Sequence, residues 1–169
     1  MKQDKNFIFD KIKCNILIVD DSKTINNVLT KKFKTNGYTT FNAYNLFEAR
    51  EIIKQNEIHY LILDINLPDG KGYDLLDELK DYSIKVFILT SQKDEEKREF
   101  SFKKGIIDFI IKDSILFQKI EQIIEMIEKL EKNKNETILI IDDSVVIQHQ
   151  LKDLFENACA GNIRTASRS

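Results

Sequence analysis

Polar residues that could do chemistry stand directly after short apolar runs in this sequence. They are Asp20 and Asp21 after NILIV, Asp64 after YLIL, Thr90 after KVFIL, and Lys112 after IDFII. Three carboxylates gathered in one place repel one another, so they are stable together mainly when a cation lies among them. Because they offer only oxygen ligands, they suit a hard ion such as Mg²⁺. If the fold brings them together, these residues predict a magnesium site.

The lysine and the threonine extend this chemistry to a phosphoryl group. The Lys112 ammonium and a bound Mg²⁺ would neutralise phosphoryl oxygens, and the Thr90 hydroxyl would donate a hydrogen bond. One of the carboxylates could then attack phosphorus in line, since an aspartate is ionised at neutral pH and needs no base. The set therefore predicts phosphoryl transfer to a carboxylate.

Each of these residues also has an ordinary structural explanation. The first two aspartates could cap the helix that follows them, and Thr90 and Ser91 could be a plain N-cap pair. Asp64 could be a turn residue before a proline-containing loop. Lys112 could be a solvated strand end. The chemical interpretation depends on all of them meeting at one place.

Apolar and helical segments alternate along the first part of the chain. The expected strands cover residues 15–19, 39–43, 60–63, 85–89 and 107–111. Apolar residues at helical spacing predict one helix opened by Ser22 and closed by Gly37, and further helices at 46–55, 73–80, 94–104 and 115–130. This alternation predicts a doubly wound α/β fold, with a parallel sheet covered on both faces. Ligands bind beyond the carboxyl ends of such strands, where the polar residues would converge.

The beginning of this pattern returns near the end of the chain. ILIVDDS at 16–22 returns as ILIIDDS at 138–144, and the match covers 15–33 and 137–155 at an offset of 122 residues. One domain length between copies predicts tandem domains: a first domain at 14–130, a linker at 131–136 and the start of a second copy at 137–169. After a second strand expected at 163–166, the copy lacks counterparts of Asp64, Thr90 and Lys112. We therefore expect the natural protein to continue beyond residue 169.

The order of these motifs resembles the receiver domains of two-component response regulators, of which the chemotaxis regulator is the simplest. The resemblance covers about residues 14–130 and begins again at 137. The residues that carry it are Asp20, Asp21, Asp64, Pro68, Gly72, Thr90, Phe109 and Lys112. Any one of them is common by chance, whereas the whole series on matching elements is not. The resemblance implies a flavodoxin-like, five-stranded parallel sheet of order 2-1-3-4-5.

The resemblance also implies how a phosphoryl group and a metal would be held. Asp64 would be the phosphoacceptor. Asp21, Asp64 and the backbone carbonyl of Asn66 would be metal ligands for Mg²⁺. Asp20 would act on the metal through water.

Further roles concern the response to the phosphoryl group. The resemblance implies that Thr90 binds a phosphoryl oxygen and that Lys112 pairs with the group. Phe109, which by itself would more often be a core residue, would be an aromatic switch that turns inward when Thr90 moves. Asn66 and Gln92 stand where side chains tune the rate of phosphoryl loss.

One residue departs from the family pattern. Receivers usually have proline after the lysine that ends the fifth strand, often with a cis bond, whereas Asp113 follows Lys112 here. We expect a trans bond, since a cis bond without proline costs about 2.5–4 kcal/mol. Asp113 could also draw Lys112 away from the site.

Composition excludes several functional classes. The chain has 169 residues, 42% hydrophobic and 32% charged, with a net charge of -2. The absence of a basic excess argues against direct binding to nucleic acid or to a membrane surface. No apolar run is long enough to span a membrane, and the start MKQDKNFIFDKIK lacks the apolar region of a signal peptide. Cys14 and Cys159 fit no metal spacing, so we expect free thiols and a cytoplasmic location.

The leading functional hypothesis is a signalling switch rather than an enzyme with turnover. A histidine kinase would phosphorylate Asp64, and the modified face would bind or release a partner. By analogy with the family, an output domain such as a diguanylate cyclase could follow, and the last helix could support a homodimer. Two alternatives stay open. A Mg²⁺-dependent phosphatase would usually need an aspartate where Asn66 stands, and a binding module that only keeps the fold would not need the intact set.

Overall fold

The computed structural model describes residues 14–91, 106–113, 115–132, 137–141, 144–158 and 162–166. The expected helix at 94–104 and Gln92 lie outside the described residues. A five-stranded parallel sheet forms the centre of the first domain. Its strands are β1 (Asn15–Val19), β2 (Thr39–Ala43), β3 (Tyr60–Asp64), β6 (Lys85–Thr90) and β7 (Ile106–Ile111).

The strand order is β2-β1-β3-β6-β7, which confirms the doubly wound fold with the first strand inside the sheet. Val19 pairs with Leu63 between β1 and β3, and Asp64 pairs with Leu89 between β3 and β6. The carboxyl ends of the three central strands therefore lie side by side at one edge, where an α/β sheet binds its ligands.

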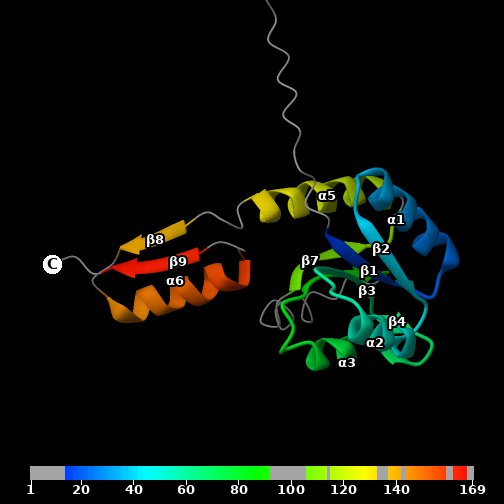
Figure 1. Ribbon diagram of the computed structural model, residues 1–169, viewed down its shortest axis with the longest axis horizontal. Coiled ribbons are helices and arrows are strands. Elements are labelled where there is room, and N and C mark those ends of the chain that lie inside the picture. The colour runs from blue at the N-terminus through cyan, green and yellow to red at the C-terminus, as the bar shows by residue number, and fades with distance from the viewer. Residues whose placement is uncertain are drawn as a thin grey trace, which may run out of the picture.

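Helices cover both faces of this sheet (Figure 1). On one face lie α1 (Lys23–Thr35) and α5 (Leu116–Lys132), and on the other α2 (Leu46–Gln55) and α3 (Gly72–Glu78). Successive β1 side chains alternate between the two cores: Leu17 packs with the α2 and α3 residues, and Ile18 with those of α1 and α5. Burial on both faces explains why β1 and β3 are nearly continuous apolar runs.

The helix boundaries follow from local capping. The Ser22 side chain accepts a hydrogen bond from the backbone N–H of Ile25, and Asn45 does the same for Glu48 at the start of α2. After α1, Gly37 has φ 86°, a left-handed conformation that glycine adopts without a steric penalty. Both ends of α1 are thus where the sequence predicts them.

A two-residue hairpin that the sequence did not predict lies directly after β3. β4 (Asn66–Leu67) and β5 (Gly70–Lys71) pair antiparallel, with Asn66 opposite Lys71. Pro68 and Asp69 form the turn between them, and proline is favoured at the first central position of such turns. What the sequence indicated as an open loop is therefore a folded element next to Asp64.

The helix α5 runs two residues beyond the expected domain boundary at residue 130. Glu131 is 9% exposed, and its Oε1 accepts a hydrogen bond of 2.7 Å from the Tyr60 hydroxyl. The first two residues of the expected linker thus belong to a helix that packs on the sheet. The sequence misled here because a glutamate in a lysine-rich stretch is typical of a solvated linker.

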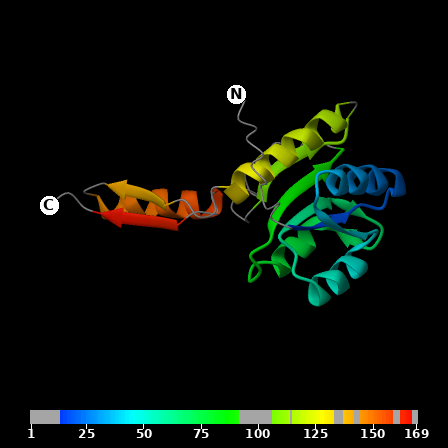
Figure 2. The ribbon, with the colours of Figure 1, turned by 45° about the horizontal axis from the view of Figure 1, so that its top comes forward.

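The second copy forms a separate βαβ unit, seen beyond the end of α5 in Figures 1 and 2. β8 (Thr137–Ile141) pairs in parallel with β9 (Asn162–Ala166), and α6 (Val145–Ala158) connects them. This arrangement repeats β1, α1 and β2. No helix in the described part of the chain combines the length and apolar character needed to cross a membrane.

Candidate functional site

Three carboxylates meet at the carboxyl edge of the sheet. Asp20 and Asp64 are 0% and 5% exposed, whereas Asp21 is exposed. One oxygen from each lies within 4.8 Å of the other two. They converge because β1 and β3 are neighbours that end at the same level. The structure thus brings together all three aspartates that the sequence singled out.

Lys112 reaches these carboxylates from the last strand of the sheet. Its Nζ lies 2.6 Å from Asp20 Oδ2 and 2.7 Å from Asp64 Oδ2. Burial alone would lower the pKa of Lys112, but hydrogen bonds and charge from the two carboxylates outweigh it and raise that pKa. The ammonium therefore stays protonated between Asp20 and Asp64.

Asp113 does not draw Lys112 away from the site in this structure. The Asp113 carboxylate binds Lys119 Nζ at 2.8 Å, one turn into the next helix. The hydrogen bond from Lys119 lowers the pKa of Asp113. No cis peptide bond occurs among the described residues, so the expected trans bond after Lys112 is confirmed. Asp113 is therefore paired with Lys119, and Lys112 is paired with Asp20 and Asp64.

Asp20 is held between a backbone N–H group and the Lys112 ammonium. Its Oδ1 accepts a hydrogen bond of 2.9 Å from the Ser22 backbone N–H. Its Oδ2 forms the 2.6 Å ion pair with the Lys112 ammonium. Burial raises the pKa of Asp20, which the Lys112 and Ser22 hydrogen bonds oppose. The oxygens of Asp20, Asp21 and Asp64 form a donor set of the kind that a hard divalent ion takes.

Thr90 and Phe109 lie where a change at the site could reach the core. Thr90 ends β6 and is 5% exposed, and its carbonyl accepts the Lys112 backbone N–H at 2.7 Å. Phe109 on β7 is 9% exposed and packs in the core on the α2 and α3 face. The ring thus occupies the inward position in this structure.

The hairpin after β3 holds the remaining expected residue, Asn66. Its backbone N–H donates to Asp64 Oδ1 at 3.2 Å. The sequence did not single out Lys71, whose Nζ donates to Asn66 Oδ1 at 2.6 Å. It also missed Asp69, which accepts the backbone N–H groups of Leu46 and Phe47 at 2.8 and 2.9 Å. Asp69 thereby fastens the hairpin to the start of α2.

Gly72 directly follows the hairpin and packs against the backbone of Asp64, the phosphoacceptor candidate. A Cβ at this position would lie 2.4 Å from the Asp64 carbonyl oxygen, closer than any side chain can come. The Gly72 N–H donates to the Ile65 carbonyl at 2.8 Å. Only glycine lets the start of α3 approach this tightly, which accounts for a glycine eight residues after Asp64.

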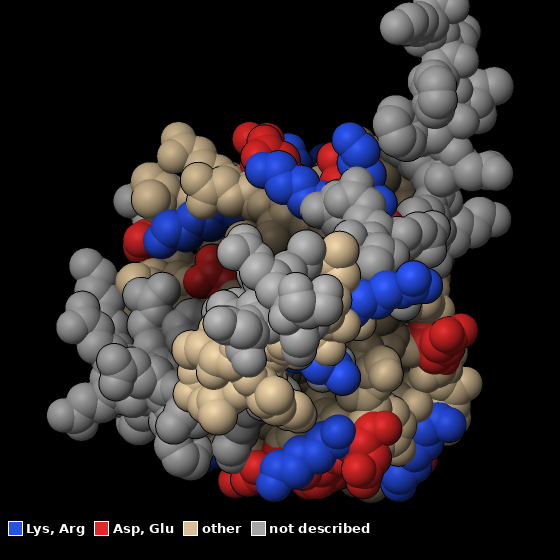
Figure 3. Space-filling model, turned by 90° about the vertical axis from the view of Figure 1, so that its left-hand side faces the viewer, with Lys and Arg blue, Asp and Glu red and all other residues tan. Residues whose placement is uncertain are grey.

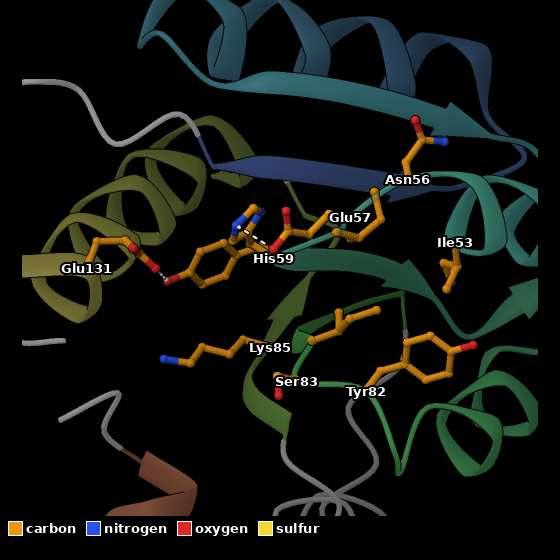
Figure 4. Close-up of a pocket in the computed structure, with 11 residues that line it drawn as sticks. Ile53, Asn56, Glu57, His59, Tyr82, Ser83, Lys85 and Glu131 are labelled. Atoms are coloured by element: carbon orange, nitrogen blue, oxygen red, sulfur yellow. Dashed lines mark hydrogen bonds and ion pairs between the residues drawn. The ribbon is translucent and has the colours of Figure 1, made fainter. Parts of the chain in front are cut away.

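A cleft of about 630 Å³ lies at the opposite end of β3 from Asp64. Figure 4 shows it between the starts of β3 and β6 and the end of α5, with the Tyr60–Glu131 hydrogen bond at one side. His59 and Lys85 also line it. The carboxylate site and this cleft are therefore separate features at the two ends of one sheet.

Charged side chains of both signs are interspersed on the face drawn in Figure 3. Blue and red residues neighbour one another across its described part, in keeping with the net charge of -2. A broad basic field, such as nucleic-acid binding uses, is not visible on that part of the face.

Comparison with known proteins identifies the family. A family model for the response regulator receiver domain matches residues 16–128. Aerobic respiration control protein ArcA of Escherichia coli K12 is 32% identical over 99 residues, 58% of this chain and 42% of ArcA. Regulatory protein VanR of Enterococcus faecium is 28% identical over 137 residues, 78% of this chain and 59% of VanR. The chain thus spans about half the length of these curated relatives.

Solved structures agree with this assignment. A two-component system response regulator/GGDEF domain protein superposes with a TM-score of 0.74 at 27% identity, covering 91% of this chain and 62% of that one. A CheY-like receiver domain protein from Methanospirillum hungatei has a TM-score of 0.63 at 27% identity, covering 71% of this chain and 98% of that one. The chain therefore belongs to the response regulator receiver domain family of two-component systems.

Proposed function

We propose that the first receiver accepts a phosphoryl group on Asp64 from a histidine kinase and thereby switches a partner or an attached output domain. The observation that carries this proposal is the position of Lys112 Nζ, 2.6 Å from Asp20 and 2.7 Å from Asp64. A buried ammonium held against a nucleophile candidate can neutralise an incoming phosphoryl oxygen. Asp21, Asp64 and the Asn66 carbonyl are the proposed Mg²⁺ ligands, with Asp20 acting through water.

The transfer uses few protein groups. One Asp64 oxygen attacks phosphorus in line as the bond to the kinase's histidine nitrogen breaks, and the imidazole leaves with that electron pair. Bound Mg²⁺ would supply positive charge to the phosphoryl oxygens as negative charge redistributes. Lys112 pairs with one of those oxygens, and the Thr90 hydroxyl donates to another. Because Asp64 is only 5% exposed, the new phosphoryl group must project toward solvent at the strand end.

The signal would leave the site through Thr90 and Phe109. Thr90 and Phe109 belong to the paired strands β6 and β7, in which Thr90 lies opposite Ile111 and Ile88 opposite Phe109. A shift of the Thr90 hydroxyl toward the phosphoryl group would favour the inward position of the Phe109 ring, which the ring already occupies in this structure. The inward ring would then define the surface that a partner recognises.

Relatives suggest what that partner could be. The solved structure with a TM-score of 0.74 is described as a response regulator/GGDEF domain protein, and this chain covers 62% of it. We propose that an output domain, with a diguanylate cyclase as one candidate, receives the signal in the natural protein.

The proposal is tested by intact mass after incubation with Mg²⁺ and acetyl phosphate. We expect wild type and Asp81→Asn, a change at an exposed carboxylate in the turn after α3, to gain one phosphoryl group. Asp64→Asn, and wild type with EDTA, should gain none. Multiple turnovers of phosphate release would favour the phosphatase alternative. A wild type without an adduct would favour a binding module and overturn the proposal.

A further inference from the structure

The β4–β5 hairpin makes a contact that the proposed transfer does not require. Asn66 and Lys71 are direct partners in its antiparallel ladder, and Lys71 Nζ donates to Asn66 Oδ1 at 2.6 Å. Side chains directly opposite each other in such a pair lie close enough to interact. The ladder thus sets the partner of the Asn66 carboxamide, although the two side chains are exposed.

Asn66 is also the immediate neighbour of the proposed phosphoacceptor. Its backbone N–H binds Asp64 Oδ1 at 3.2 Å, while Lys112 binds Asp64 Oδ2 at 2.7 Å. Asp64 is nearly buried and Asn66 is exposed, so the Asn66 side chain stands at the solvent-facing border of the site. Water that hydrolyses a phosphoryl group on Asp64 must enter from solvent, past such border residues.

We propose that Lys71 is a positioning residue that orients the Asn66 carboxamide at this border and thereby prolongs the lifetime of the phosphoryl group on Asp64. A primary amide has one acceptor oxygen and two N–H donors. With the oxygen held by Lys71, the N–H donors are the groups left to face an anion. This inference rests on the proposed function.

The reaction that Lys71 would slow is hydrolysis. A water oxygen attacks phosphorus, the bond from phosphorus to Asp64 oxygen breaks, and Asp64 returns as a carboxylate while the water protons leave with inorganic phosphate or pass to solvent. An oriented amide occupies space on the water's approach.

The first experiment measures the rate of phosphoryl loss in Mg²⁺ after acetyl phosphate is removed. We expect Lys71→Met to shorten the lifetime about three- to tenfold, the factor that corresponds to one net hydrogen bond. Lys71→Arg, which retains a cationic donor, should keep most of the wild-type lifetime of the phosphoryl group. The matched control is Lys80→Met, since Lys80 is equally an exposed lysine but pairs with Asp77, at 3.3 Å.

A double-mutant cycle then tests whether Lys71 acts through Asn66. In an Asn66→Ala background, Lys71→Met should change the lifetime less than twofold, because no carboxamide remains to orient. An unchanged lifetime in Lys71→Met alone, or a full effect that persists without the amide, overturns the inference while leaving phosphorylation of Asp64 intact. A wild type that is never phosphorylated at Asp64 overturns both.

Discussion

The chain contains the same βαβ unit twice, in two very different environments. In the first copy, β1 lies between β2 and β3, and Leu17 is 0% exposed. In the second copy, β8 pairs only with β9 among the described residues, and Leu139, which corresponds to Leu17, is 56% exposed. The same sequence pattern therefore specifies the same local structure without specifying burial.

Local hydrogen bonds are indeed repeated closely. The Ser22 hydroxyl accepts from Ile25 N–H at 3.4 Å, and the Ser144 hydroxyl accepts from Ile147 N–H at 3.4 Å. What differs comes from distant parts of the chain. β3 pairs with one side of β1 and ends in Asp64, and Lys112 directly follows β7. The comparison shows that the carboxylates after β1 meet Asp64 and Lys112 through strands that come later in the chain than β2.

The largest expected effect concerns core burial. Leu17→Ala removes a fully buried side chain and should lower the free energy of unfolding by about 2–5 kcal/mol. Leu139→Ala changes an exposed side chain and should cost less than about 0.5–1 kcal/mol. Urea unfolding followed by circular dichroism measures both. Equal losses would mean that the two copies are equally packed in solution.

The next effect concerns a polar residue at the same position of each copy. Asn26 is fully buried, and its side-chain N–H group donates to the carbonyls of Asp20 at 2.6 Å and Ala43 at 3.2 Å. Asn26→Ala should therefore cost about 1–3 kcal/mol, since it leaves buried acceptors unpaired. Gln148, its counterpart, reaches the Ala166 carbonyl at 3.4 Å, so Gln148→Ala should cost less. A larger loss from Gln148→Ala in the same unfolding measurement would reverse the comparison.

Mg²⁺ affinity should depend on Asp20 in the first copy and not on Asp142 at the same position of the second copy. Asp20→Asn should weaken Mg²⁺ affinity about 10–100-fold, the usual cost of losing a residue that orients the metal's own ligands. Asp142→Asn, at the corresponding position of the second copy, should leave the affinity unchanged, because the proposed site is formed by Asp20, Asp21 and Asp64. Calorimetric titration with Mg²⁺ distinguishes these results. Comparable weakening by Asp142→Asn would show that the second corner binds metal by itself.

The smallest effect is a pH dependence from an ion pair between α2 and α3 of the first copy. Arg50 on α2 binds Glu78 on α3 at 2.6 Å, and its hydrogen bond lowers the pKa of Glu78 below 4.5. A lowered pKa stabilises the fold at pH values above 4.5. This stabilisation disappears as the pH falls through the pKa of Glu78 in the folded state. Because the pair is partly exposed, it should contribute at most about 1 kcal/mol. Glu78→Gln should therefore lower the free energy of unfolding at pH 7 and leave it unchanged near pH 2. The same loss at both pH values would mean that the Arg50–Glu78 ion pair is not its cause.

The sequence predicted the parts of the fold that local signals determine. The strands at 15–19 and 39–43 and the helix at 46–55 have the expected bounds, since apolar runs and caps lie within each segment. The convergence of Asp20, Asp64 and Lys112 was also predictable from their positions at strand ends. The Lys71–Asn66 and Tyr60–Glu131 hydrogen bonds were not, because the first needs an unpredicted hairpin and the second joins residues 71 positions apart.

The most direct test of the central claim is the location of the phosphoryl group in the intact chain. After treatment with acetyl phosphate and Mg²⁺, borohydride reduces an aspartyl phosphate to a stable homoserine that peptide sequencing by mass spectrometry can place. We predict conversion at Asp64 alone. Conversion at Asp142 or Asp143, or a reactive chain in which Asp64 stays unmodified, would contradict the account.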